Sequence, residues 1–161
     1  MSLTTLPGAP FVHYSQGALQ VEGVDLAQLA QTHATPLFVY SQASILAALA
    51  AYQQGLAGRQ SLICYALKAN SNLAILQLLA QAGCGFDTVS QGEMERALKA
   101  GADPQKLVFS GVGKTRAEMR FALGIGIHCF NVESRAELEV LSQVASSMGR
   151  TAPISVRVNP N

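Results

Sequence analysis

The chain has 161 residues, of which 49% are hydrophobic and 13% charged, with 11 basic against 10 acidic residues and a formal net charge of +1. This composition is typical of a packed globular domain and excludes a disordered chain. The nearly balanced charges form no basic run, which excludes the positive surface that nucleic acid or an anionic membrane would need. A small-molecule partner is predicted instead.

Targeting and metal signals are also missing from the sequence. The start, MSLTTLPGAPF, has neither the basic nor the apolar region of a secretory signal. The longest apolar run, residues 45–52, is far shorter than the roughly 18 residues of a membrane span. The three cysteines, Cys64, Cys84 and Cys129, are widely spaced without a CxxC pair. They are predicted to be reduced, buried thiols of a cytoplasmic protein, and no metal site is predicted.

Residues 11–56 show a mixed pattern. Residues 11–21 have β character around a Gln16-Gly17 turn signal, residues 25–35 indicate a short helix, and residues 37–40 indicate a strand. Ser41 then caps a helix whose apolar stripe is made of Ile45, Leu49, Tyr52 and Leu56.

From residue 63 onward the chain repeats one unit. The β-rich runs 63–67, 86–89, 107–109, 128–132 and 154–158 start 23, 21, 21 and 26 residues apart, and each of the first four is followed by a helical pattern. Ser90, Thr115 and Ser134 each stand three residues before a glutamate, as in the capping box that starts a helix. The helices are predicted to stop at glycines, namely Gly83, Gly101, Gly124 and Gly149.

Strand, cap, helix and glycine in this order indicate consecutive βαβ units around a parallel sheet. An open doubly wound sheet and a (β/α)8 barrel both remain possible, and the even spacing favours the barrel. We therefore predict an α/β fold, a partial (β/α)8 TIM-type barrel with about five βα units, preceded by a short β segment. Residues 25–161 are assigned to the incomplete barrel. Residues 1–24 are assigned to a β segment that would pair with a C-terminal β-domain outside this chain.

Lys68 is the first candidate functional residue, because it follows the apolar run 63–67 and precedes the polar turn Ala69-Asn70-Ser71-Asn72. Ligands of parallel α/β folds bind at the carboxyl ends of the strands. A lysine that is partly desolvated there has a lowered pKa and acts as a nucleophile toward an aldehyde such as that of pyridoxal phosphate. A solvated lysine at the rim of the sheet is the alternative.

The motifs YALKANSN, GFDTVSQGEMERALKAGADPQKLVFSGVGKT, CFNVES and SVRVNPN occur in this order. In this the chain resembles the N-terminal part of the diaminopimelate decarboxylases, pyridoxal-phosphate enzymes of the alanine-racemase-like barrel class. The resemblance implies that Lys68 carries pyridoxal 5'-phosphate covalently. It also implies decarboxylation of meso-diaminopimelate to L-lysine in lysine biosynthesis, by a cytoplasmic homodimer.

Two further residues are candidates for cofactor binding. Asp87 follows Gly85-Phe86 and is placed to pair with a cation near the cofactor; a carboxylate that helps to start the next helix is the alternative. Arg157 lies within the run 154–158, where it should meet an anion or a carboxylate such as Asp87.

The stretch 110–115, SGVGKT, is not a P-loop, since Val108 stands where that pattern needs glycine, and its glycines are predicted to form a tight turn before Thr115.

The resemblance also places several functional groups outside this chain. These are the histidine that stacks on the cofactor ring, the glycine-rich loop for its phosphate, the acid facing the ring nitrogen, and the residues that meet substrate across a dimer interface. Two alternatives to a diaminopimelate decarboxylase therefore remain. One is a non-catalytic chain that binds the cofactor weakly, and the other is a related ornithine or arginine decarboxylase or amino-acid racemase.

Overall fold

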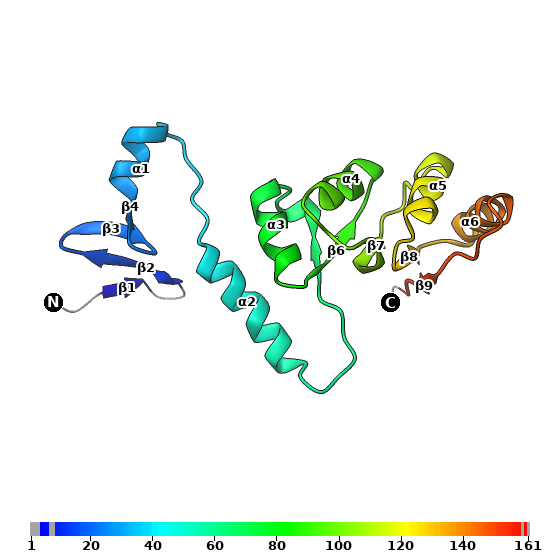
Figure 1. Cartoon of the computed structure of the whole chain (residues 1–161), viewed down its shortest axis with the longest axis horizontal. Coiled ribbons are helices and arrows are strands. Elements are labelled where there is room, and N and C mark those ends of the chain that lie inside the picture. Colours follow the sequence, from blue (N-terminus) through cyan, green and yellow to red (C-terminus); the bar gives the residue numbers. More distant parts are fainter. Residues whose placement is uncertain (1–3, 7–8, 159, 161) are drawn as a thin grey trace. The chain divides into compact units, whose positions relative to one another are not determined.

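The computed structural model describes residues 4–6, 9–158 and 160 and contains two compact units, Met1–Gly58 and Arg59–Asn161. The first unit begins with an antiparallel sheet whose strands neighbour each other in chain order (Figure 1). Its strands are β1 Thr4–Leu6, β2 Ala9–Ser15, β3 Ala18–Val21 and β4 Val24–Asp25.

Two-residue turns join β2 to β3 and β3 to β4. Gln16 and Gly17 have φ of 51° and 84°, and Glu22 and Gly23 have φ of 52° and 85°. Positive φ at both positions is the backbone of a type I′ turn, whose twist matches that of the flanking strands. The predicted turn at Gln16-Gly17 is confirmed, and the one at Glu22-Gly23 was not predicted.

Two helices complete this unit. Helix α1, Leu26–His33, starts where Asp25 accepts the amides of Ala27 and Gln28. Helix α2, Gln42–Gly55, starts where Ser41 accepts the amide of Ser44. Both predicted helices are therefore confirmed.

The predicted strand at residues 37–40 is wrong. No strand is assigned there, and Phe38 and Tyr40 are 84% and 56% exposed. A β-strand requires a hydrogen-bonded neighbour, and within the described ranges none pairs with this segment. The predicted boundary after residue 24 concerns pairing with a further β-domain, and it stays a prediction.

The second unit is built on a five-stranded sheet in which every pairing is parallel. Its strands neighbour each other in chain order and are β5 Cys64–Ala66, β6 Gly85–Thr88, β7 Leu107–Phe109, β8 Cys129–Val132 and β9 Ile154–Val156. All five predicted strands are thus present, although β5 and β9 are each two residues shorter than predicted.

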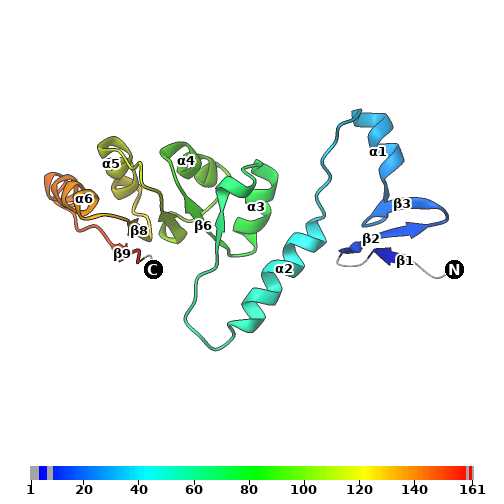
Figure 2. The ribbon, with the colours of Figure 1, turned by 180° about the vertical axis from the view of Figure 1, so that it is seen from behind.

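Helical segments connect these strands. They are η1 Leu67–Ala69, α3 Leu73–Gln81, α4 Gln91–Lys99, η2 Pro104–Lys106, α5 Arg116–Ile125 and α6 Arg135–Ser147. Right-handed crossovers between successive neighbouring strands place all connecting helices on one face of the sheet. Figure 1 shows α4, α5 and α6 along the same side of the strands, and the reverse view in Figure 2 agrees. A doubly wound sheet would reverse its strand order, so the arrangement is that of a partial barrel.

The core of this unit lies between the sheet and its helices. Alternate strand residues point toward the helices, and Phe86, Phe109 and Phe130 are completely buried there. The rings of Phe109 and Phe130 lie 6.0 Å apart, centroid to centroid. Met94 and Ala97 of α4 are also completely buried.

Three of the four predicted helix ends are confirmed. Gly83, Gly101 and Gly149 follow α3, α4 and α6 with positive φ. The prediction at Gly124 is wrong, because this residue lies inside α5 and the left-handed residue that ends the helix is Gly126, with a φ of 74°. Both glycines fit the sequence pattern, and only the length of the helix distinguishes them.

Candidate functional site

The candidate site lies at the carboxyl ends of strands β5 to β9, and Lys68 stands at the first of them. Strand β5 ends at Ala66, and the chain continues as the 3-10 turn η1, which contains Lys68 and packs against β6. Leu67 is completely buried and anchors this turn, whereas Lys68 is exposed. The predicted position at a strand end is therefore observed, but the predicted partial desolvation of the side chain is not.

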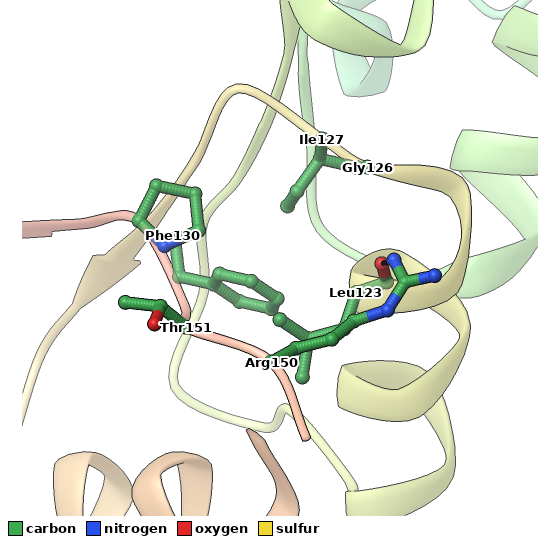
Figure 3. Close-up of a pocket in the computed structure, with 7 residues that line it drawn as sticks. Leu123, Gly126, Ile127, Phe130, Arg150 and Thr151 are labelled. Carbon is green, nitrogen blue, oxygen red and sulfur yellow. Dashed lines mark hydrogen bonds between the residues drawn. The ribbon is translucent and has the colours of Figure 1, made fainter. Parts of the chain in front are cut away.

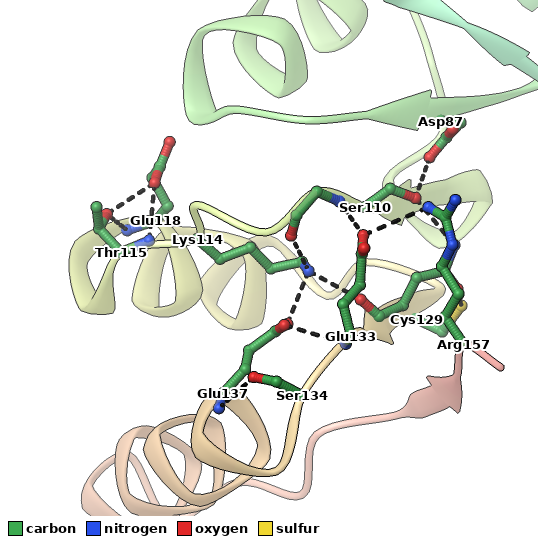
Figure 4. Close-up of polar contacts among 12 residues, drawn as sticks. Asp87, Ser110, Lys114, Thr115, Glu118, Cys129, Glu133, Ser134, Glu137 and Arg157 are labelled. Atoms are coloured by element: carbon green, nitrogen blue, oxygen red, sulfur yellow. Dashed lines mark hydrogen bonds and ion pairs between the residues drawn. The ribbon is translucent and has the colours of Figure 1, made fainter. Parts of the chain in front are cut away.

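A chain of hydrogen bonds crosses the next three strands. Asn131 on β8 donates from Nδ2 to Oγ of Ser110 at 2.9 Å, and Ser110 donates to Oδ1 of Asp87 at 2.5 Å (Figure 4). Asp87 pairs in register with Ala66, two residues before Lys68. The structure thus places Asp87 on the strand beside the lysine and holds its carboxylate from the side away from β5.

Arg157 meets a carboxylate, but a different one from the predicted Asp87. Its Nη1 lies 3.5 Å from Oε1 of Glu133, and the two side chains are 62% and 14% exposed. The same carboxylate oxygen accepts the amide of Gly111 at 2.8 Å. Since β9 ends at Val156, Arg157 extends past the sheet rather than lying within an apolar strand, and Glu133, one residue past β8, is the nearer carboxylate. Glu133 was not among the residues predicted from the sequence.

The thiols of the three cysteines show how the charge of Asp87 acts on the strands around it. They are free thiols; Cys84 is buried, as predicted, while Cys64 and Cys129 are half-buried. Burial raises the pKa of the Cys64 thiol to about 11, with further contributions from Cys84, Asp87 and Cys129. Burial also raises the pKa of Cys129, and Asp87 adds to the effect. The charge of Asp87 therefore acts on thiols of both β5 and β8, on the face turned away from the helices.

Lys114 is the functional-site neighbour that sequence reasoning missed. The loop 110–115 makes a tight turn at Gly111, with a φ of 97°, before Thr115 caps α5, as predicted. Within it the Lys114 side chain is 0% exposed and forms an ion pair of 2.7 Å with Glu137. A lysine between a glycine and a helix cap is predicted to be an exposed loop residue, and nothing in the local sequence indicates that it is buried.

The helices that start at this end carry the predicted caps in two forms. Thr115 and Glu118 form a complete capping box. Ser90 and Ser134 accept the amides of Glu93 and Glu137, but these glutamates accept the amide of the residue before the cap, Val89 or Glu133. Each glutamate thereby ties the end of a strand to the helix that follows it.

A crevice of about 300 Å³ lies at the opposite end of the sheet (Figure 3). Its lining comes from the end of α5, from Phe130 of β8 and from the segment before β9, which includes Arg150 and Pro153. Arg150 donates from Nη1 to the carbonyl of Leu123 near the end of α5. The crevice is therefore a feature of the amino-terminal side and does not belong to the candidate site.

Comparisons with known proteins agree with this arrangement. Residues 42–161 match the family described as pyridoxal-dependent decarboxylase, pyridoxal binding domain. The chain is 56% identical over 148 residues to the diaminopimelate decarboxylase of Pseudomonas aeruginosa, a match that covers 92% of this chain and 36% of the relative.

Solved structures give the same result. The diaminopimelate decarboxylase of M. jannaschii superposes with a TM-score of 0.92 at 36% identity, over 97% of this chain and 37% of that one. The Helicobacter pylori enzyme in complex with L-lysine superposes with a TM-score of 0.82 at 51% identity, over 85% and 35% of the two chains.

The chain thus spans about a third of the length of the curated relatives it matches. No helix in the described part of the chain is long and apolar enough to cross a membrane. The parallel sheet, the lysine at its first carboxyl end and the match over residues 42–161 lead to one conclusion: the chain belongs to the pyridoxal-dependent decarboxylases, and residues 42–161 match their pyridoxal binding domain.

Proposed function

We propose that this chain is the N-terminal, cofactor-carrying part of an enzyme that decarboxylates meso-diaminopimelate to L-lysine. The observation that carries the proposal is the position of Lys68, an exposed amine at the carboxyl end of β5 beside Asp87 of β6. The names of the relatives, which match at 47% to 56% identity in P. aeruginosa, Vibrio cholerae and Aquifex aeolicus, support the choice of substrate.

The residues present fit a pyridoxal cofactor. A primary amine must reach the aldehyde, and Lys68 is exposed on a turn that buried Leu67 holds in place. Lys68 would hold the cofactor covalently. When bound, pyridoxal phosphate supplies the electron-accepting ring that takes up the electron pair of the departing carboxylate.

Asp87 and Arg157 are proposed as cofactor-binding residues. Asp87 accepts a hydrogen bond from Ser110 on one oxygen, which orients the carboxylate, and its other oxygen would pair with a cation near the cofactor. Nη1 of Arg157 lies 3.5 Å from Oε1 of Glu133, and the Arg157 side chain is largely exposed. Other N–H donors of its guanidinium would bind an anion. These two residues would orient the bound group.

A complete protein that contains this segment would act on a small amino acid. Its homodimeric state, its cytoplasmic location and the pairing of residues 1–24 with a further β-domain remain predictions from the resemblance. A second proposal is that the 161-residue chain alone binds the cofactor without turnover. It is favoured because the chain spans only about a third of the length of its relatives.

The test is a chimera in which residues 1–161 replace the matching segment of the P. aeruginosa relative. We expect release of carbon dioxide and L-lysine from meso-diaminopimelate, its loss in Lys68→Ala, and its retention in Lys99→Ala, an exposed lysine of α4. Preference for ornithine or arginine, or racemisation without carbon dioxide release, would refute the proposed substrate and reaction. Turnover by the 161-residue chain alone would refute the second proposal.

A further inference from the structure

A second lysine, Lys114, is buried beneath the same end of the sheet. Its Nζ lies 2.6 Å from the carbonyl oxygen of Gly111, 2.8 Å from that of Asn131 and 2.7 Å from Oε1 of Glu137 (Figure 4). It also lies 5.5 Å from the centre of the Phe109 ring. An ammonium group has three N–H donors, so these three acceptors satisfy it completely.

The three acceptors belong to three different elements. Gly111 follows β7, Asn131 lies in β8, and Glu137 lies in the first turn of α6. A single buried charge therefore joins two strand ends to a helix start.

Two of these acceptors are also connected to candidate cofactor residues. Asn131 donates to Ser110, which donates to Asp87. Gly111 donates its amide to Glu133, the partner of Arg157. The ammonium of Lys114 thus stands where the connections to Asp87 and to Arg157 meet.

We propose that Lys114 is a positioning residue for the cofactor site. It fixes the backbone at Gly111 and Asn131 so that the hydrogen bond to Asp87 and the ion pair of Arg157 with Glu133 keep their geometry. This inference rests on the proposed function, because it assigns Lys114 a role toward the group that Lys68 would carry. The alternative is a crosslink that contributes only to stability.

Replacing Lys114 with methionine keeps much of the side-chain volume and removes the charge. Two carbonyls and the Glu137 carboxylate then lose a donor in a buried place, which favours a shift of the loop. The double variant Lys114→Met/Glu137→Gln removes the uncompensated charge and keeps an oxygen that accepts the amide of Glu133, so much of the stability should return. The ties to Gly111 and Asn131 remain lost in both variants, which separates positioning from stability.

The experiment uses the 161-residue chain with pyridoxal phosphate and cyanoborohydride, and mass spectrometry follows the rate of labelling at Lys68. Amide hydrogen exchange at Gly111 is measured without cofactor. The control is Leu141→Ala, which removes a buried side chain of α6 that is 1% exposed and makes none of these hydrogen bonds. Its stability loss should resemble that of Lys114→Met.

We expect labelling at Lys68 to slow by about tenfold or more in Lys114→Met and in the double variant, because small misplacements of positioning groups cost such factors. Gly111 should exchange faster in both variants, and Leu141→Ala should be labelled at the parent rate. Parental labelling in the double variant, or equal slowing in Leu141→Ala, would overturn the inference. If Lys68 is not labelled even in the parent, the proposed function fails. Unchanged exchange of Gly111 in both variants would refute the positioning role whether or not Lys68 is labelled.

Discussion

Gly85, the first residue of β6, should not tolerate a side chain. A Cβ added to its backbone would lie 2.5 Å from the carbonyl oxygen of Lys106 and 2.9 Å from Sγ of Cys64. Real contacts of a Cβ essentially never fall below 3.0 Å, so the Lys106 carbonyl would have to move by at least the difference, 3.0 − 2.5 = 0.5 Å. That carbonyl precedes β7, whose pairing with β6 begins at Phe86 and Leu107. A movement there strains the centre of the sheet.

Overpacking of this kind costs about 1–3 kcal/mol, and the fixed backbone oxygen places Gly85→Ala toward the upper half of this range. For a unit of this size a loss of about 2 kcal/mol lowers the Tm by roughly 8–16 °C. The measurement is thermal unfolding of the chain followed by circular dichroism.

Gly124→Ala is the matched control for Gly85→Ala. Gly124 lies inside α5, and a Cβ added there would meet no neighbouring atom within 4 Å. Alanine there should raise stability by about 0.5–1 kcal/mol, since glycine is a poor helix former. If Gly85→Ala unfolds at the parent temperature, the described approach of β6 to Lys106 is wrong.

Two further predictions concern titratable groups. Hydrogen bonds from the amide and hydroxyl of Thr115 and from the amide of Gln91 lower the pKa of Glu118 below its ordinary 4.5, against the effect of burial. The ionised Glu118 carboxylate therefore stabilises the fold fully above pH 4.5, and this contribution is lost as the pH falls through the lowered pKa. Glu118→Gln should reduce the acid sensitivity of unfolding below about pH 5. An unchanged pH profile of unfolding would contradict this. The pKa of the Cys64 thiol is raised from 9.0 to about 11, so at pH 8 this thiol should react with iodoacetamide about a hundredfold more slowly than an ordinary thiol. Asp87→Asn should speed the reaction. Peptide mass mapping measures both rates. Equal rates in the parent and in the variant would argue against a charge on Asp87 near this thiol.

The repeat of strands and helices could be predicted from the sequence because its signals are local. A strand such as β7, Leu107–Phe109, is a short apolar run between turn residues, and Thr115 with Glu118 forms a cap within four residues. The sequential order of the strands then follows from short right-handed connections. The segment 37–40 has the composition of a strand but no neighbour in the described chain, and composition does not reveal pairing.

The candidate site could be predicted only in part. Lys68 was found because an apolar run ends on a charge at a strand end. The partner of Arg157 and the burial of Lys114 depend on contacts between elements more than twenty residues apart, as in the ion pair of Lys114 with Glu137. Such pairs are set by the register of parallel strands, which local patterns do not specify.

The proposed function depends on Lys68 being the amine that holds the cofactor. Its most direct test is to add pyridoxal phosphate to the chain, reduce with borohydride and map the modified peptide by mass spectrometry. We predict one dominant label on Lys68, in the peptide that contains YALKANSN, and none on buried Lys114. A dominant label on any other lysine, or equal labelling of all exposed lysines, would contradict the assignment.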